Sequence, residues 1–186
     1  MLYTRKGDGG TTKTFGSNER ISKSSAKAEA LGALDEINSF LGIVKVLSKQ
    51  YGYTIEINNT AIAFDSVVHD VQETLFIIQA EVAGFPKGLA EEKITHIENI
   101  IDTAEKILPP IKTFFISGGT DLAARFDVAR TLARRAERRV VQVHEEGTGI
   151  GATTRAYLNR LSSLLYALAR LSNHISGVIE TPPSYS

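Results

Sequence analysis

Glycine, threonine and lysine are concentrated between residues 4 and 16 of the 186-residue chain. Glycines let backbone amides turn toward an anion, and threonine hydroxyls and lysine amines donate hydrogen bonds to phosphate oxygens. The segment has neither the period of a helix nor that of a strand, and it does not match the standard P-loop spacing. Its chemistry predicts a loop that binds a polyphosphate, with a flexible N-terminal arm as the alternative.

A second concentration of polar residues lies at 125–139, where six arginines occur in fifteen residues. Arg130, Arg134 and Arg138 follow the i, i+4, i+8 spacing of one helix ridge, and Glu137 lies on the same side. The ridge is about 100° from the apolar stripe of that helix, at the edge of its buried face. This position favours the rim of a site or a contact between subunits. A solvated basic face and an RNA-binding ridge are the alternatives.

A third group of polar residues consists of Asp35 and Asn38, which lie just off the apolar stripe of the first predicted helix, beside Gly42. A carboxylate in such a position is usually solvated or paired. We therefore expect an ion pair between Asp35 and one of the arginines at 125–139, with a role as general acid or base as the alternative.

Several other chemistries are excluded or disfavoured. The chain has no cysteine, which excludes thiolate chemistry and disulfides. None of its four histidines follows a glutamate by three residues, which argues against a ferritin-like di-iron centre. Ser24 to Lys27 matches the S-x-x-K pattern, but the motifs that accompany that chemistry are missing and helix capping explains the serines.

Five amphipathic helices are predicted to position these residues, because apolar side chains recur at intervals of three and four in five stretches. The stretches run from Ser24 or Ser25 to a polar break at 50–59, over 68–82, over 94–108, from Asp121 to Gly147, and over 153–175. Residues 113–120 form a predicted loop, and short strands are expected only at 51–57 or 114–116. The predicted fold class is all-α: an up-and-down five-helix bundle with an irregular Gly/Thr/Lys-rich N-terminal segment.

One domain accounts for the whole chain, with an N-terminal segment over 1–25, the bundle over 26–175 and a tail over 176–186. Lys plus Arg and Asp plus Glu both number 21, and a net charge of zero argues against bulk attraction to nucleic acid. Uncharged stretches reach nine residues, as at 161–169, against the roughly 18 that a membrane span needs. The N-terminus lacks the apolar run of a secretory signal, so we expect a cytoplasmic location.

Three groups of motifs follow one another along the chain. The first group comprises YTRKGDGGTT at 3–12, Lys23, and GALDEINS at 32–39. The second group is ARTLARRAERRVV at 129–141, and the third is YLNRLS at 157–162. In their order and spacing they resemble the ATP:cob(I)alamin adenosyltransferases of the propanediol-utilisation type, a family of corrinoid adenosyltransferases.

The resemblance implies a homotrimer of five-helix bundles with sites between neighbouring subunits. The implied ATP-binding residues are Thr4, Arg5, Lys6, Gly7, Thr12, Lys13, Lys23, Arg134, Arg135, Glu137, Arg138 and Asn159. Mg²⁺ would be held through the ATP phosphates, with no protein ligand assigned. Asp35 and Arg130 would form an ion pair between subunits on the corrinoid side, where Phe114 would displace the lower cobalt ligand. Arg134, Lys23 and Phe114 would be the catalytic residues.

The reaction that the resemblance implies transfers the 5′-deoxyadenosyl group of ATP to the Co(I) of reduced cobalamin or another corrinoid. The products would be adenosylcobalamin and triphosphate, and a flavin-dependent reductase is a candidate partner. A sensor bundle that binds ATP or a corrinoid without turnover is the alternative function. An RNA-binding helical module is a third reading, and the zero net charge argues against it.

The chain departs from the family pattern at four positions. The family often has Pro at Ser117, His at Asp127, Asp at Ser163 and Arg at Lys27. Ser117 and Asp127 are expected near the corrinoid, so these two departures bear on which corrinoid is accepted rather than on ATP.

Overall fold

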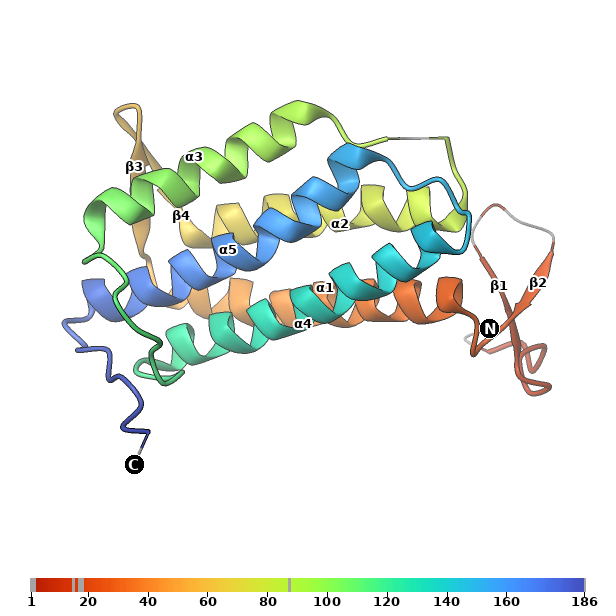
Figure 1. Ribbon diagram of the computed structural model, residues 1–186, viewed down its shortest axis with the longest axis horizontal. Helices are drawn as coiled ribbons and strands as arrows, with labels where there is room; N and C mark the ends of the chain where they lie inside the picture. Colours follow the sequence, from red (N-terminus) through yellow and green to blue (C-terminus); the bar gives the residue numbers. More distant parts are fainter. Residues whose placement is uncertain (1–2, 15, 17–18, 87, 186) are drawn as a thin grey trace.

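The computed structural model describes residues 3–14, 16, 19–86 and 88–185. Within them, five helices form a bundle, which confirms the predicted fold class. The helices are α1 (Ala26–Tyr51), α2 (Phe64–Ala83), α3 (Glu91–Ile107), α4 (Asp121–Glu145) and α5 (Ala152–Ile175). α4 packs against both α1 and α5, while α2 lies on α1 and α3 lies on α5 (Figure 1). No helix in this part of the chain combines the length and apolar character that a membrane span requires.

Small side chains bring α4 close to its neighbours. Ala129, Ala133 and Ala136 are fully buried on the predicted stripe of that helix. The predicted start of α1 and end of α2 are observed, whereas α2 and α3 begin at Phe64 and Glu91, before their predicted starts at 68 and 94. The Ser25 hydroxyl accepts a hydrogen bond from the Ala28 amide at 3.3 Å, and Gly84 ends α2 with a left-handed φ of 111°.

Two short hairpins lie at opposite ends of the bundle (Figure 1). One pairs β1 (Thr11–Lys13) with β2 (Arg20–Ser22) in antiparallel register. The prediction of a wholly irregular N-terminal segment is therefore wrong at these residues. Strands of three residues are too short to show an alternating pattern, and this hairpin is held by the Arg20 side chain, which donates to the Thr11 carbonyl at 2.7 Å.

The second hairpin pairs β3 (Thr54–Ile57) with β4 (Thr60–Ala63) through a turn with positive φ at Asn58 and Asn59. The strand predicted within 51–57 is confirmed. The alternative strand at 114–116 is wrong, because that segment has a single backbone hydrogen bond to the tail, from the Ile116 amide to the Thr181 carbonyl at 2.9 Å.

Candidate active site

The loop that joins α3 to α4 forms one wall of a cavity of about 610 Å³, whose other walls are α4 and α5. We call it the loop cavity. Its loop residues include Phe114 and Ser117, and its helix residues include Asp127, Arg130 and Arg134. Phe114 is 78% exposed, so an exposed aromatic ring and two arginines line the same cavity. The cavity thus combines apolar surface with positive charge.

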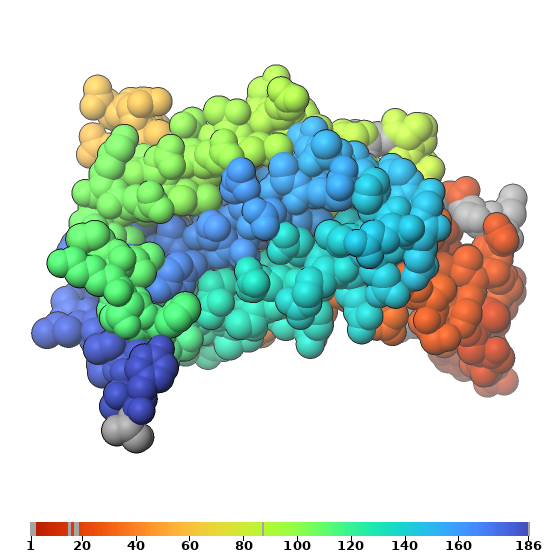
Figure 2. All heavy atoms as spheres, in the orientation of Figure 1, coloured from red at the N-terminus to blue at the C-terminus, as the bar shows by residue number. Residues whose placement is uncertain are grey.

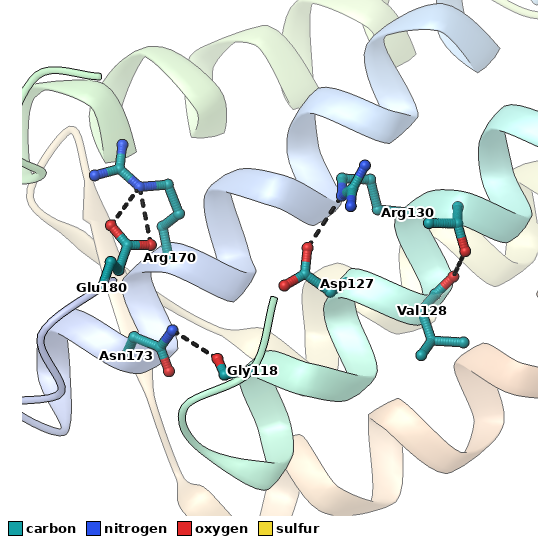
Figure 3. A network of polar contacts seen from close by, with 8 residues as sticks. Gly118, Asp127, Val128, Arg130, Arg170, Asn173 and Glu180 are labelled. Carbon is teal, nitrogen blue, oxygen red and sulfur yellow. Dashed lines mark hydrogen bonds and ion pairs between the residues drawn. The ribbon is translucent and has the colours of Figure 1, made fainter. Parts of the chain in front are cut away.

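Arg130 already has a carboxylate partner within its own chain. Its Nε donates to Asp127 Oδ1 at 3.1 Å (Figure 3). Its guanidinium lies 5.7 Å from the ring centroid of Tyr166. Both residues of this pair lie on α4, three positions apart, and both line the loop cavity. Burial raises the pKa of the Tyr166 phenol above its ordinary value.

A second cavity, of about 360 Å³, lies farther along the same two helices, and we call it the helix cavity. Four of the predicted ATP residues line it: Arg134, Glu137, Arg138 and Asn159. The Asn159 side chain donates to Glu137 Oε1 at 2.9 Å, which fixes these two polar groups relative to one another. Arg134 lines both the loop cavity and the helix cavity. Its guanidinium therefore lies where ligands in the two cavities would meet.

The N-terminal residues of the predicted ATP site come together at the β1–β2 hairpin. The Lys23 amide donates to the Gly10 carbonyl at 2.9 Å, and the Lys23 side chain lies against Gly7. Thr4 accepts from the Lys6 amide at 3.4 Å within the turn before β1. These contacts place a lysine amine beside a glycine-rich turn, as a site for phosphate requires.

Two of these residues, Thr12 and Lys13, line a third cavity, of about 670 Å³, between the hairpin, α1 and α2. We call it the hairpin cavity. It is also lined by Asp35 but by no residue of α4 or α5, and none of the described residues of the N-terminal segment lines the helix cavity. The structure therefore divides the predicted ATP residues into a hairpin group and a group on α4 and α5, on different surfaces of the chain.

The ion pairs between α1 and α4 differ from the prediction. Asp35 is exposed in the hairpin cavity and forms no pair with an α4 arginine within the described chain. Glu36 pairs instead with Arg135, and Glu29 pairs with Arg139 at 3.8 Å. Asp35 points away from α4 because it is one residue, about 100° of helix, before Glu36. A pair between Asp35 of one subunit and Arg130 of another stays a prediction.

Sequence reasoning missed three polar residues around the loop cavity, namely Arg170, Asn173 and Glu180. Arg170 is only 5% exposed, and it directly follows the uncharged stretch that ends at Ala169. A charge within a buried helical stripe is the signal that could have found it, since an isolated buried charge needs a partner.

The helical bundle thus carries two cavities that share Arg134: one is lined mainly by charged side chains of α4 and α5, and the other combines arginines with apolar loop side chains. The family model described as cobalamin adenosyltransferase matches residues 2–172, and the chain belongs to that family.

Curated relatives agree with this assignment. The corrinoid adenosyltransferase PduO of Citrobacter freundii is 36% identical over 180 residues, which cover 93% of this chain and 50% of that protein. The corrinoid adenosyltransferase of Bacillus subtilis is 36% identical over 95% of this chain and 89% of its own length. The chain thus spans about half the length of the PduO relative and most of the shorter one.

Solved structures share the fold over nearly the full chain. A PduO-type ATP:corrinoid adenosyltransferase from Lactobacillus reuteri, a phenylalanine-to-alanine variant complexed with cobalamin and ATP, has a TM-score of 0.86 and 28% identity. It covers 99% of both chains. An arginine-to-lysine variant complexed with ATP has a TM-score of 0.84 at 28% identity and covers 98% of this chain and 99% of its own.

Proposed function

We propose that this chain transfers the 5′-deoxyadenosyl group of ATP to the cobalt of a reduced corrinoid. The observation that carries the proposal is the position of Arg134, which lines both the polar helix cavity and the larger loop cavity. A transfer between two ligands requires their reacting atoms to meet, and a cation at the junction stabilises the charge that develops there. Family membership and the ATP and cobalamin complexes of the Lactobacillus reuteri enzyme support the same reaction.

In this reaction the electron pair of Co(I) attacks C5′ of ATP, the C5′–O bond breaks, and triphosphate leaves with that bond's electrons. The cobalt is formally oxidised to Co(III) as the carbon–cobalt bond forms. Cobalt supplies the nucleophile, so no side chain needs to. Arg134 and Arg138 on α4, with Lys23 of the hairpin group, supply positive charge for the departing triphosphate.

Mg²⁺ fits this site as a companion of the phosphates. Among the described residues no cluster of three or more His, Asp or Glu side chains could hold a metal without another ligand. Glu137 and Glu145 nevertheless line the helix cavity, and one or two carboxylates with phosphate oxygens and water are the usual ligands of Mg²⁺. Bound there, the ion would neutralise part of the triphosphate charge.

A homotrimer with sites between subunits would join the two groups of ATP residues. Two features support this arrangement: the hairpin group and the α4/α5 group lie on different surfaces of one chain, and α1 exposes Ile43 and Val46 at 51% and 61%. Large exposed apolar side chains on a helix face are typical of subunit contacts. Closed rotational symmetry would place the hairpin group of each subunit against α4 and α5 of the next. We further propose that the enzyme works in the cytoplasm with a separate reductase.

The experiment follows the visible spectrum of chemically reduced cobalamin, without oxygen, after the protein, Mg²⁺ and ATP are added. We expect ATP-dependent conversion to a light-sensitive adenosyl–cobalt product. Binding of ATP without conversion would reject the enzymatic function and favour a sensor.

A further inference from the structure

Arg170 on α5 joins three separate segments of the chain. Its Nε donates to both carboxylate oxygens of Glu180, at 2.8 and 3.1 Å (Figure 3). Its Nη2 donates to the Pro109 carbonyl at 3.1 Å. Glu180 belongs to the C-terminal tail, and Pro109 begins the loop that forms a wall of the loop cavity. One buried guanidinium therefore links α5, the tail and the loop.

Further contacts hold the same loop along its length. The guanidinium of Arg170 lies 5.2 Å from the ring centroid of Phe115, and the Ile116 amide donates to the tail carbonyl of Thr181 at 2.9 Å. Asn173, one turn after Arg170, donates to the Gly118 carbonyl at 2.9 Å (Figure 3). The loop is thus held at its start, middle and end by α5 and the tail. In Figure 2 the dark blue tail lies next to the green loop at one end of the molecule.

The apolar side chains carried by this loop are not buried by these contacts. Phe114 is 78% exposed and Ile111 is 55% exposed, although the backbone beside them is fixed. A buried ion pair is a costly way to hold two segments together, since packed apolar side chains stabilise as well or better. The arrangement therefore fixes the backbone while it leaves the ring of Phe114 presented at the cavity rim.

We propose that Arg170 and Glu180 are positioning residues for the corrinoid: the pair holds the tail on the loop and thereby sets the place of Phe114 in the loop cavity. The inference builds on the proposed function. Neither side chain lines the helix cavity, so the pair acts on the corrinoid and not on ATP.

The test compares two variants of the full chain with a matched control. Glu180→Gln keeps the shape of the side chain and removes its charge, and Arg170→Lys keeps the charge but loses the multiple hydrogen bonds. Asp70→Asn removes the charge from an ion pair with Lys93 between α2 and α3, away from the cavities. For each protein the KM for reduced cobalamin, the KM for ATP and the hydrogen exchange of the Ile116 amide are measured.

For Glu180→Gln we expect the KM for cobalamin to rise about tenfold, as the loss of a hydrogen bond between charged groups predicts. The KM for ATP stays unchanged, and the Ile116 amide exchanges faster. Arg170→Lys should give an intermediate KM for cobalamin, and Asp70→Asn should match the wild type.

If the wild type is active, two results would overturn the positioning role. One is an unchanged KM for cobalamin in both variants. The other is an equal rise in the KM values for cobalamin and for ATP, because such a rise indicates a merely structural role. A wild type that binds ATP but produces no adenosyl–cobalt product would instead reject the proposed function, and this inference with it.

Discussion

At the scale of single residues, Arg134 is the side chain that relates the loop cavity to the helix cavity. The side chain is exposed on α4, so its burial contributes little to the stability of the bundle. It is also the member of the arginine ridge that lines both the loop cavity and the helix cavity. A function for this residue can therefore be tested without disturbing the fold.

Arg134→Ala should lower the rate of adenosyl transfer by about 10² to 10³, the usual cost of losing one donor to a developing anion. The far-ultraviolet circular dichroism and the oligomeric state should not change. Arg139→Ala is the control, since Arg139 lies on the same helix but contacts Glu29 and Gln142 at the surface. Full turnover in Arg134→Ala would reject the role assigned to this residue.

Arg130→Ala should act on the corrinoid rather than on ATP, because Arg130 lines the loop cavity and not the helix cavity. Loss of a charged hydrogen-bonding group predicts a rise of about tenfold in the KM for the corrinoid. Steady-state kinetics with each substrate varied in turn measure both KM values. An equal rise in the KM for ATP would contradict this division of the site.

The sequence identified site residues where they lie close together along the chain. The arginine ridge and the Gly/Thr/Lys segment were found because each shows its spacing within about fifteen residues. Arg170 was missed because its partner Pro109 is 61 residues away. Its other partner, Glu180, is nearer, but it lies beyond the end of α5, where helix periodicity assigns no position. The ion pairs of α1 were assigned to Asp35 instead of Glu36, since periodicity places a side chain on a face but does not choose its partner.

At the scale of elements, the first turn of α5 depends on a carboxylate from another helix. Gly151 precedes α5 and offers no side-chain cap. Glu81 on α2, which is 9% exposed, accepts the Gly151 amide at 2.6 Å and also the Thr154 hydroxyl. A carboxylate at a helix N-terminus is further stabilised by the helix dipole. Glu81 thus fixes the end of α5 from which Asn159 extends.

Glu81→Ala should lower the free energy of unfolding by about 1–3 kcal/mol, because it leaves the buried Thr154 hydroxyl and the Gly151 amide without this acceptor. Thr154→Val removes one of the two bonds at nearly constant volume and should cost less. Urea unfolding at one fixed protein concentration measures both variants. A smaller loss for Glu81→Ala than for Thr154→Val would contradict this account of the helix start.

The turn before α4 provides a second test. Gly119 has a φ of 99°, and a Cβ there would overlap the side-chain amide of Asn173. Gly147 has a similar φ of 96°, but a Cβ there would meet nothing within 4 Å. Both alanine variants have unfavourable backbone conformations, whereas Gly119→Ala must also displace Asn173.

We expect Gly119→Ala to be less stable than Gly147→Ala in urea unfolding, and to weaken corrinoid binding as well. The left-handed backbone conformation alone costs an alanine about 1–2 kcal/mol in stability. Equal stability of the two variants would show that the contact between the loop and Asn173 contributes nothing to the free energy of unfolding.

The elements themselves were predictable to the extent that apolar residues repeat. The helices α1 and α4 have long, regular stripes, and the boundary predicted at Ser25 is confirmed by its hydrogen bond to the first turn of α1. The hairpin of β1 and β2 was missed, because strands of three residues are too short to show an alternating pattern. β4 was missed because it continues directly into α2 without a break in apolar residues.

At the scale of the whole molecule, a single chain does not bring the two halves of the proposed ATP site together. The hairpin group holds Lys23 beside Gly7 at one surface, and Arg134 lies in the groove between α4 and α5. In the proposed homotrimer each site takes its hairpin from one subunit and its arginines from the next. This arrangement gives the protein an activity that depends on assembly, and it can be tested with two inactive variants.

The decisive measurement is the adenosyl-transfer activity of Lys23→Ala and Arg134→Ala chains co-expressed in equal amounts. Each variant alone should be inactive. If the halves come from different subunits, random assembly leaves about a quarter of the sites with both halves intact, and the mixture should show about a quarter of the wild-type activity. Activity no higher than that of the separate variants, in trimers shown to contain both chains, would contradict a site shared between subunits.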